Sequence, residues 1–215
     1  MMKQSVHVDI VSDIVCPWCI IGYRQFEQAF NKLKEQLTVS IHWQPFQLNP
    51  AMPLSGESML ERNAAKYGSP LVDLACQKSS VIQLGSSLGI TFNYHDEMRV
   101  YNTLYAHQLL HWAGKRGRQT ELKIALLEAY FTHGKNVTDI ETLADTAQSV
   151  GLERREALSI IIEGRYLKPV LQLEQEWRSR GVQSVPTFVF DNKIVLEGAP
   201  GVAAFTEVIN REVQS

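Results

Sequence analysis

Strand-like sequence patterns in this chain of 215 residues occur only towards its two ends. The segment VHVDIVSDIV near the start alternates polar and apolar residues, and so does TVSIHWQPF, which follows a helical stretch. Near the end, TFVFDNKIVLEG contains two β-rich runs joined by Asp191-Asn192, which tolerate the positive φ of a tight hairpin turn. Between residues 59 and 165 we find no strand, only successive helical patterns, most of which end in glycine.

This distribution predicts an α/β fold in which strands from both ends share one sheet and the helical middle is an insertion. The domain boundaries that we expect are residues 1–55 and 166–215 for the two parts of the sheet domain and 56–165 for the helical insertion. The helices predicted inside the insertion span residues 59–68, 70–89, 99–117, 119–134, 139–151 and 154–164.

The composition is that of an ordinary soluble protein, with 45% hydrophobic and 20% charged residues and a net charge of −2. These values give no reason to expect a nucleic-acid or membrane partner. The opening segment MMKQSVHVDIVSDIV lacks the continuous apolar core of a signal peptide, so we expect a cytoplasmic protein. Three cysteines are too few for a disulfide-rich secreted scaffold, and a close pair in a reducing cytosol is more often catalytic or metal-binding.

Two of the three cysteines, Cys16 and Cys19, lie where the first strand is followed by the first helix, in the motif Cys-Pro-Trp-Cys. Pro17 suits the first position of a helix, which places Cys16 at the helix N-terminus. Free amide groups and the positive end of the helix dipole stabilise an anion there and lower the pKa of a thiol. Cys19, one turn further on, can form a disulfide with Cys16 and is the natural resolving thiol.

A second motif, SVPTFVF, places Pro186 at the start of a strand, directly after Val185. Proline biases the preceding residue towards an extended conformation, and the bond between the two residues is a candidate cis peptide. The presence of a Cys-x-x-Cys pair at a strand–helix junction of the same chain strengthens this expectation.

The order of these motifs resembles the DsbA-like branch of the thioredoxin superfamily, and more narrowly the FrnE-like cytosolic group of dithiol-disulfide oxidoreductases and isomerases. The segments that carry the resemblance are VCPWCIIG, HWQPFQLNP, NTLYAHQLLHWA and GVQSVPTFVFDNKIVLEGA. The resemblance implies a thioredoxin fold with a large all-helical insertion, a nucleophilic Cys16, a resolving Cys19 and a cis Pro186 that faces the disulfide. The backbone of Val185 would then pair with an extended substrate strand.

The function implied is dithiol–disulfide exchange or isomerisation, through a mixed disulfide between Cys16 and a thiol- or disulfide-containing protein or small molecule. The residues expected to contact the substrate are Pro17, Trp18, Val185 and Pro186. Asn102 and His107, from the third of these segments, are further candidates for the cleft between insertion and sheet, although an ordinary helix face explains them equally well. No cofactor is expected, while glutathione as a co-substrate and a homodimer both stay open.

The chain departs from the strong oxidants of the DsbA type at Trp18, where those proteins often carry a histidine. Trp18 adds an apolar surface without a charge. We therefore expect a less extreme oxidant.

A metal site is the main rival interpretation of the cysteine pair, because Cys-x-x-Cys together with His107 and His111 has the residue types of a zinc finger. The stretch between Cys19 and His107 is far longer than the loop of a finger, and no second Cys-x-x-Cys exists, so we expect no metal site. An iron–sulfur cluster shared by two subunits and a pair of inert buried thiols are the remaining alternatives.

Two further residues are expected to take no part in the chemistry. Asp13, three residues before Cys16, is interpreted as a solvated loop carboxylate. Cys76 has no partner in the sequence and is interpreted as an ordinary thiol in a helix rather than a third redox centre.

Two other functions fit the same architecture. Enzymes of the 2-hydroxychromene-2-carboxylate isomerase and kappa-class glutathione transferase kind share it, but they usually present serine where this chain has Cys16. A non-catalytic peptide-binding or chaperone module would tolerate the loss of both thiols, whereas an oxidoreductase would not.

Overall fold

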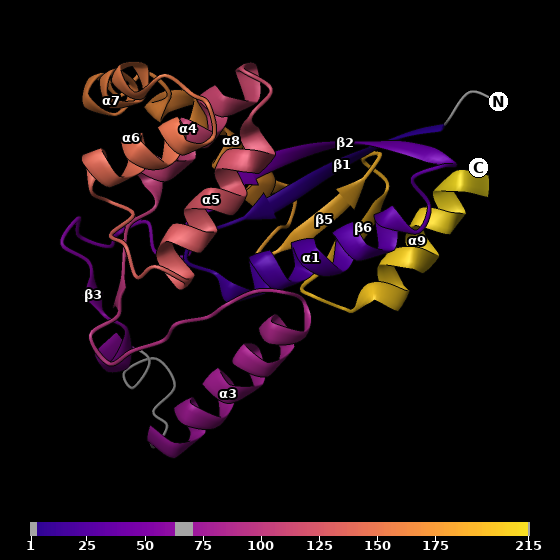
Figure 1. Ribbon diagram of the computed structural model, residues 1–215. Helices are drawn as coiled ribbons and strands as arrows, with labels where there is room; N and C mark the ends of the chain where they lie inside the picture. The colour runs from indigo at the N-terminus through magenta and orange to yellow at the C-terminus, as the bar shows by residue number, and fades with distance from the viewer. Residues whose placement is uncertain (1–3, 63–70, 215) are drawn as a thin grey trace.

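The two ends of the chain form one four-stranded sheet in the computed structural model, which describes residues 4–62 and 71–214 (Figure 1). Strand β1 (Gln4–Ser12) pairs in parallel with β2 (Leu37–Pro45). On its other side β1 pairs antiparallel with β5 (Thr187–Phe190), which in turn pairs antiparallel with β6 (Ile194–Glu197). The order β2-β1-β5-β6 confirms the predicted pairing of the two ends.

Helices cover both faces of this sheet. Helices α1 (Pro17–Asn31) and α9 (Val202–Gln214) pack on one face and lie in front of it in Figure 1. Helix α8 (Leu167–Ser179) packs on the other face, where Trp177 joins Val11 and Val189 in a small cluster. Alternate residues of a strand point to opposite faces, so both faces of β1 are buried. The core residues between the sheet, α1 and α9 include Val6, Val8, Ile10, Tyr23, Phe26, Phe188, Phe190 and Phe205.

The remaining helices form the insertion and have a core of their own. They are α3 (Leu71–Ser87), α4 (Leu104–Lys115), α5 (Gln119–Phe131), α6 (Ile140–Ser149) and α7 (Arg154–Glu163). All five lie within the predicted insertion 56–165, although its exact boundaries stay a prediction. Ile14, Ile20 and Ile21 belong to the same core as the insertion helices. The insertion is therefore packed directly on the turn from β1 to α1.

One part of the insertion differs from the prediction, because two short strands occur there. β3 (Glu57–Ser58) and β4 (Arg99–Val100) pair antiparallel, and the predicted helix 99–117 begins only at Leu104. A strand of two residues is too short for an alternating pattern to be recognised. Of the predicted helix 59–68, residues 59–62 are helical and the remainder lies outside the described residues.

The hairpin between β5 and β6 has the predicted turn. Asp191 and Asn192 have φ values of 46° and 58°, as required for both central residues of a type I′ turn. The backbone N–H of His7 donates to Oδ1 of Asp191 at 2.9 Å, which holds the turn against the start of β1.

The outer edge of β2 contacts α5 of the insertion. Gln119 accepts the backbone N–H of Trp43 through Oε1 at 2.9 Å and donates from Nε2 to the carbonyl oxygen of Trp43 at 3.0 Å. The indole N–H of Trp43 donates to Oγ1 of Thr120 at 3.0 Å. Both backbone groups of Trp43 that face away from β1 are thus hydrogen-bonded to one side chain.

The helices of the described residues have lengths that are ordinary for a globular protein. Helix α3, for example, has 17 residues. Within residues 4–62 and 71–214, none is both long and apolar enough to cross a bilayer.

Candidate active site

Cys16 lies at the N-terminus of α1, in the position that the sequence predicts. Its backbone is extended, with φ −101° and ψ 112°, and Pro17 begins the helix. The carbonyl oxygen of Cys16 accepts the backbone N–H of Cys19 at 3.1 Å. The sulfur of Cys16 is therefore carried at the positive end of the helix dipole, where an anion is stabilised.

Cys16 also faces the segment before β5. Its Sγ lies 3.5 Å from the carbonyl oxygen of Val185, although 169 positions separate the two residues. The bond between Val185 and Pro186 is cis, which confirms that expectation. Val185 lies just outside the paired part of β5, which begins at Thr187. The fold thus brings the two sequence motifs together.

The contact between α1 and Pro186 depends on Gly22. A Cβ added at Gly22 would lie 3.1 Å from Cγ of Pro186, 3.2 Å from Cε2 of Phe188 and 3.3 Å from the carbonyl oxygen of Gly198. Only the absence of a side chain at this position allows the helix to approach the proline so closely.

Both cysteines of the motif are buried, and burial affects the chemistry of Cys19 in particular. Both are free thiols, and both are buried, Cys16 with 4% and Cys19 with 0% of its surface exposed. Burial raises the pKa of Cys19 well above its ordinary value, and the hydrogen bond and charge of Cys16 raise it further, whereas the cation of Lys123 opposes this shift. Trp18, between them in sequence, is 42% exposed and presents its indole to solvent beside the pair.

Asp13 is fully buried, so its interpretation as a solvated loop carboxylate was wrong. Its Oδ1 accepts the N–H of Ile14 at 2.7 Å and lies 3.3 Å from Nε2 of His107, while its Oδ2 accepts the N–H of Leu48 at 2.8 Å. Burial alone would raise the pKa of Asp13, but the hydrogen bond and charge of His107, followed by the N–H of Leu48, outweigh it and leave the pKa below its ordinary value. The carboxylate is therefore an anion at neutral pH.

Lys123 of α5 is a second buried charge that sequence reasoning missed. It is 0% exposed, and its Nζ has no hydrogen-bond partner among the described residues. The amine lies 5.3 Å from the centroid of the Trp43 ring. Burial lowers the pKa of Lys123 to about 8, against the opposing charges of Cys19, Asp13 and Cys16. The amine of Lys123 can therefore gain or lose a proton near neutral pH, and its charge interacts with both thiols.

Tyr94 is a further residue that no pattern in the sequence singled out. Burial raises the pKa of its phenol well above the ordinary value, and the charge of Cys16 adds to this effect. The ring stacks on Phe92 with centroids 5.7 Å apart. The phenol therefore stays protonated on the side of the site formed by the insertion.

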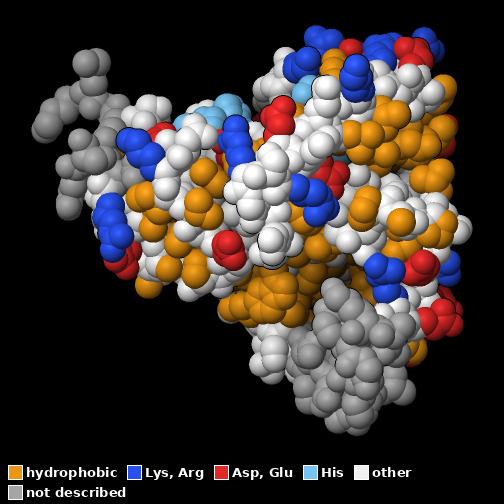
Figure 2. Space-filling view, turned by 180° about the vertical axis from the view of Figure 1, so that it is seen from behind, with side chains coloured by type: hydrophobic (Ala, Val, Ile, Leu, Met, Phe, Trp, Pro, Cys, Tyr) orange, Lys and Arg blue, Asp and Glu red, His pale blue; other side chains and the backbone are white. Residues whose placement is uncertain are grey.

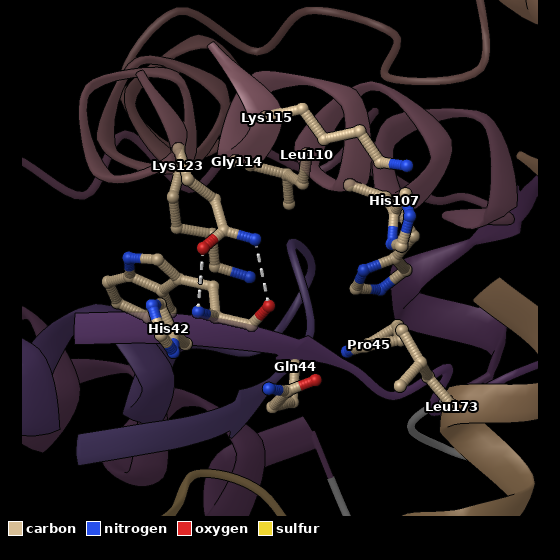
Figure 3. Close-up of a pocket in the computed structure, with 12 residues that line it drawn as sticks. His42, Gln44, Pro45, His107, Leu110, Gly114, Lys115, Lys123 and Leu173 are labelled. Carbon is tan, nitrogen blue, oxygen red and sulfur yellow. Dashed lines mark hydrogen bonds between the residues drawn. The ribbon is translucent and has the colours of Figure 1, made fainter. Parts of the chain in front are cut away.

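A cavity of about 300 Å³ lies between β2 and helices α4, α5 and α8 (Figure 3). Lys123 and His107 reach it from the helices above β2, and neither cysteine lines it. Its other titratable residues are His42, His111 and Lys115. Burial and the charge of Lys115 lower the pKa of His111. Lys123 thus lines a cavity that carries three further groups able to hold a positive charge, besides His107.

The two weaker candidates from the sequence have different surroundings. His107 is buried against Asp13, as described above, and so lies close to the cysteine turn. The amide of Asn102 donates to the carbonyl oxygens of Pro50 and Met52, and its Oδ1 accepts the N–H of Leu104. Asn102 therefore holds the loop after β2 and the start of α4.

Cys76 falls within the backbone of α3, but its side chain lies outside the described residues. Its interpretation as an ordinary thiol stays a prediction.

Known proteins resemble this chain over nearly its whole length. Residues 7–210 match the family model described as the DSBA-like thioredoxin domain. The uncharacterized protein YwbO of Bacillus subtilis (strain 168) is 27% identical over 213 residues, which make up 97% of this chain and 98% of the relative.

Solved structures show the same likeness. A probable DsbA oxidoreductase from Streptomyces coelicolor has a TM-score of 0.91 and 27% identity, with 98% of this chain and 91% of that chain covered. The cytosolic disulfide reductase DsbM from Pseudomonas aeruginosa with GSH has a TM-score of 0.66 at 13% identity, with 97% and 100% covered, a likeness that concerns the fold alone. The sheet, the inserted helices and the match over residues 7–210 agree, and the chain belongs to the DSBA-like thioredoxin domain family.

Proposed function

We propose that this protein is a thiol–disulfide oxidoreductase that acts through the pair Cys16 and Cys19. The observation that carries the proposal is the position of Cys16, whose sulfur lies at the N-terminus of α1 and 3.5 Å from the carbonyl oxygen of Val185. A thiolate is favoured at a helix N-terminus, and an extended substrate segment can pair with backbone beside the sulfur.

The proposed reaction proceeds through a mixed disulfide. In the reducing direction, the Cys16 thiolate attacks one sulfur of a substrate disulfide, the substrate S–S bond breaks, and the other substrate sulfur leaves as a thiolate. Cys19 then attacks Cys16, the substrate is released as its second thiolate, and a disulfide between Cys16 and Cys19 remains. The oxidising direction reverses these steps.

The residues behind the cysteines support a role in handling the proton of Cys19. Cys19 must lose its proton before it attacks Cys16, and burial makes its anion costly. Lys123 lowers this cost by its charge, and its own pKa of about 8 allows it to gain or lose a proton near neutral pH. Asp13 places a negative charge near Lys123, which keeps the amine protonated to a higher pH than burial alone would allow.

We assign the protein to the cytoplasm and to the FrnE-like group, as the sequence suggests. Glutathione is the small-molecule partner that we propose for regenerating the reduced pair, because the pair needs a thiol donor after each reducing turnover. The fold neighbour DsbM, with GSH in its structure, is compatible with this choice.

The test is a trapping experiment with single cysteine variants and a peptide that contains one intramolecular disulfide. Cys19→Ser is expected to accumulate a mixed disulfide between Cys16 and the peptide, visible in the intact mass, because no thiol remains to release it. Cys16→Ser is expected to form no adduct and to lose reductase activity with glutathione. The matched control Cys76→Ser should retain reductase activity and, like the parent, should release the peptide rather than accumulate the adduct.

The proposal would be refuted by a Cys16→Ser variant with unchanged activity, or by a Cys19→Ser variant that captures no peptide. Absence of reductase activity in the parent, together with peptide binding that survives the replacement of both thiols, would instead favour a binding module that does not need them.

A further inference from the structure

We propose that His7, Asp9 and His42 form a zinc-binding site on the face of the sheet that carries α8. This site uses none of the cysteines and does not depend on the proposed redox function. From the sequence alone we weigh a metal only at the cysteine pair and expect no metal site.

The three side chains come from neighbouring positions on two paired strands. His7 and Asp9 are two residues apart on β1, and Asp9 is paired with His42 on β2, so all three side chains point to one face. One ligand atom from each residue lies within 4.8 Å of the other two. Figure 2, which views the molecule from behind, shows histidine side chains at the surface on this side.

The distances are close to those that a metal ion requires. Nε2 of His7 lies 3.0 Å from Oδ2 of Asp9, and the ring centroids of His7 and His42 are 4.5 Å apart. Two ligands at Zn–N and Zn–O distances of about 2.0–2.1 Å with a tetrahedral angle lie roughly 3.4 Å apart. The pair His7–Asp9 therefore needs to open only slightly, and the exposed ring of His42 can rotate inwards.

The charge of Asp9 favours a cation at this point. Asp9 is buried to 5% exposure, and among the described residues its ion pair is with His7 rather than with lysine or arginine. A buried carboxylate without a permanent cationic partner is costly, and a divalent metal ion supplies the missing charge.

A neighbouring residue orients the carboxylate. Nε2 of Gln44 donates to Oδ1 of Asp9 at 2.6 Å, which leaves Oδ2 directed at His7. His42 and Gln44, both labelled in Figure 3, are two residues apart on β2, so their side chains extend to the same face of the sheet. Hydrogen bonds of this kind fix the orientation of ligating carboxylates in metal sites.

The residue types of the three proposed ligands favour zinc over other metal ions. Two imidazole nitrogens and one carboxylate oxygen suit zinc, whereas calcium and magnesium prefer oxygen ligands throughout. Because His42 is exposed, water can take the fourth position. The ion would tie β1 to β2 near the start of the sheet.

The test measures zinc binding to the full chain in which Cys16, Cys19 and Cys76 are replaced by serine, because thiols also bind zinc. Competition with a chromophoric chelator is expected to show one zinc ion per chain. His7→Ala and His42→Ala should each raise the dissociation constant at least about tenfold, and Gln44→Leu by roughly tenfold. The matched control His133→Ala, at an exposed histidine far along the chain, should leave it unchanged.

A thermal-unfolding measurement separates lost binding from lost folding. Zinc should raise the melting temperature of the thiol-free chain and of the His133→Ala control, because it binds the folded state, but not that of folded His42→Ala or of Asp9→Asn. Absence of saturable binding to the thiol-free chain, or unchanged affinity in His7→Ala and His42→Ala, would overturn the proposal.

Discussion

Nε2 of His107 lies 3.3 Å from Oδ1 of Asp13, and both side chains are buried although 94 positions separate them in the sequence. Asp13 immediately precedes the turn that carries Cys16, and His107 lies in α4 of the insertion. The helical insertion is thus joined to the cysteine turn by a polar contact as well as by apolar packing.

Asp13→Asn should lower the free energy of unfolding by roughly 2–3 kcal/mol at neutral pH, because it removes the charge from a buried hydrogen-bonded pair. The folded pKa of Asp13 is below its unfolded value of 3.8, so its contribution is complete above that value and is lost as the pH falls through the folded pKa. Urea unfolding of both proteins at several pH values measures this. A difference that persists undiminished in strong acid would contradict the prediction.

Lys123→Met should make the protein more stable at neutral pH. Burial lowers the folded pKa of Lys123 from 10.5 to about 8. Below the folded pKa the buried cation costs up to roughly 3 kcal/mol. Between the two pKa values the unfolded chain binds the proton and the folded chain does not, so the parent gains stability as the pH rises and the difference from Lys123→Met shrinks. Urea unfolding at neutral and at alkaline pH checks both statements, and a less stable variant at neutral pH would contradict them.

The same Lys123→Met variant should resolve its mixed disulfide more slowly. Removing the cation raises the pKa of Cys19 further. The resolution rate should fall roughly threefold to fourfold for each pKa unit, because the thiolate fraction falls tenfold while the nucleophilicity of the thiolate rises with its pKa. Stopped-flow release of a peptide from the Cys16 adduct measures this rate. Lys135→Met, at an exposed lysine, is the control and should resolve at the parent rate.

Gly22→Ala should destabilise the protein, although alanine is the better helix former. The helix gains about 0.5–1 kcal/mol from this change, whereas overpacking a core costs about 1–3 kcal/mol. The clash involves Pro186, buried Phe188 and a backbone oxygen, none of which can move easily. Gly114→Ala in α4 is the matched control, since the nearest atoms to its added Cβ are those of the Gln119 side chain at 3.4 Å, an ordinary van der Waals distance. It should be as stable as the parent or more so, and equal urea midpoints for the two variants would contradict the argument.

Trp18→His should make the Cys16–Cys19 disulfide more oxidising. A histidine cation at this exposed position would stabilise the Cys16 thiolate and hence the reduced form. A shift of about 30 mV corresponds to roughly tenfold in the equilibrium with glutathione. Mass spectrometry of alkylated samples in glutathione buffers measures that equilibrium, and Trp18→Phe should stay at the parent value. An unchanged potential in Trp18→His would show that this position does not tune the pair.

The sequence alone predicted the elements that depend on local patterns. The Cys-Pro-Trp-Cys turn and the Asp191-Asn192 hairpin each rest on residues close together in the chain. The cis bond before Pro186 was expected partly because the same chain carries the Cys-x-x-Cys pair. The strands at the two ends were recognised from their alternating residues, and their pairing followed because a sheet needs partners.

The charges behind the cysteines were not predictable in the same way. Lys123 lies on the apolar side of its helix, three and four residues before Leu126 and Leu127, but a lysine is ordinarily exposed. Asp13 is a carboxylate in a turn and would ordinarily be exposed as well. Their burial results from contacts with distant segments, namely Trp43 below Lys123 and His107 beside Asp13. No local pattern records such contacts.

Gln119 makes, at the edge of the sheet, the two hydrogen bonds to the backbone of Trp43 that a neighbouring strand would otherwise make. An uncovered sheet border recruits strands from other molecules. A shortened chain that joined the sheet segments directly and omitted residues 56–165 would leave β2 uncovered, and we expect it to associate with itself rather than fold as a small independent thioredoxin unit.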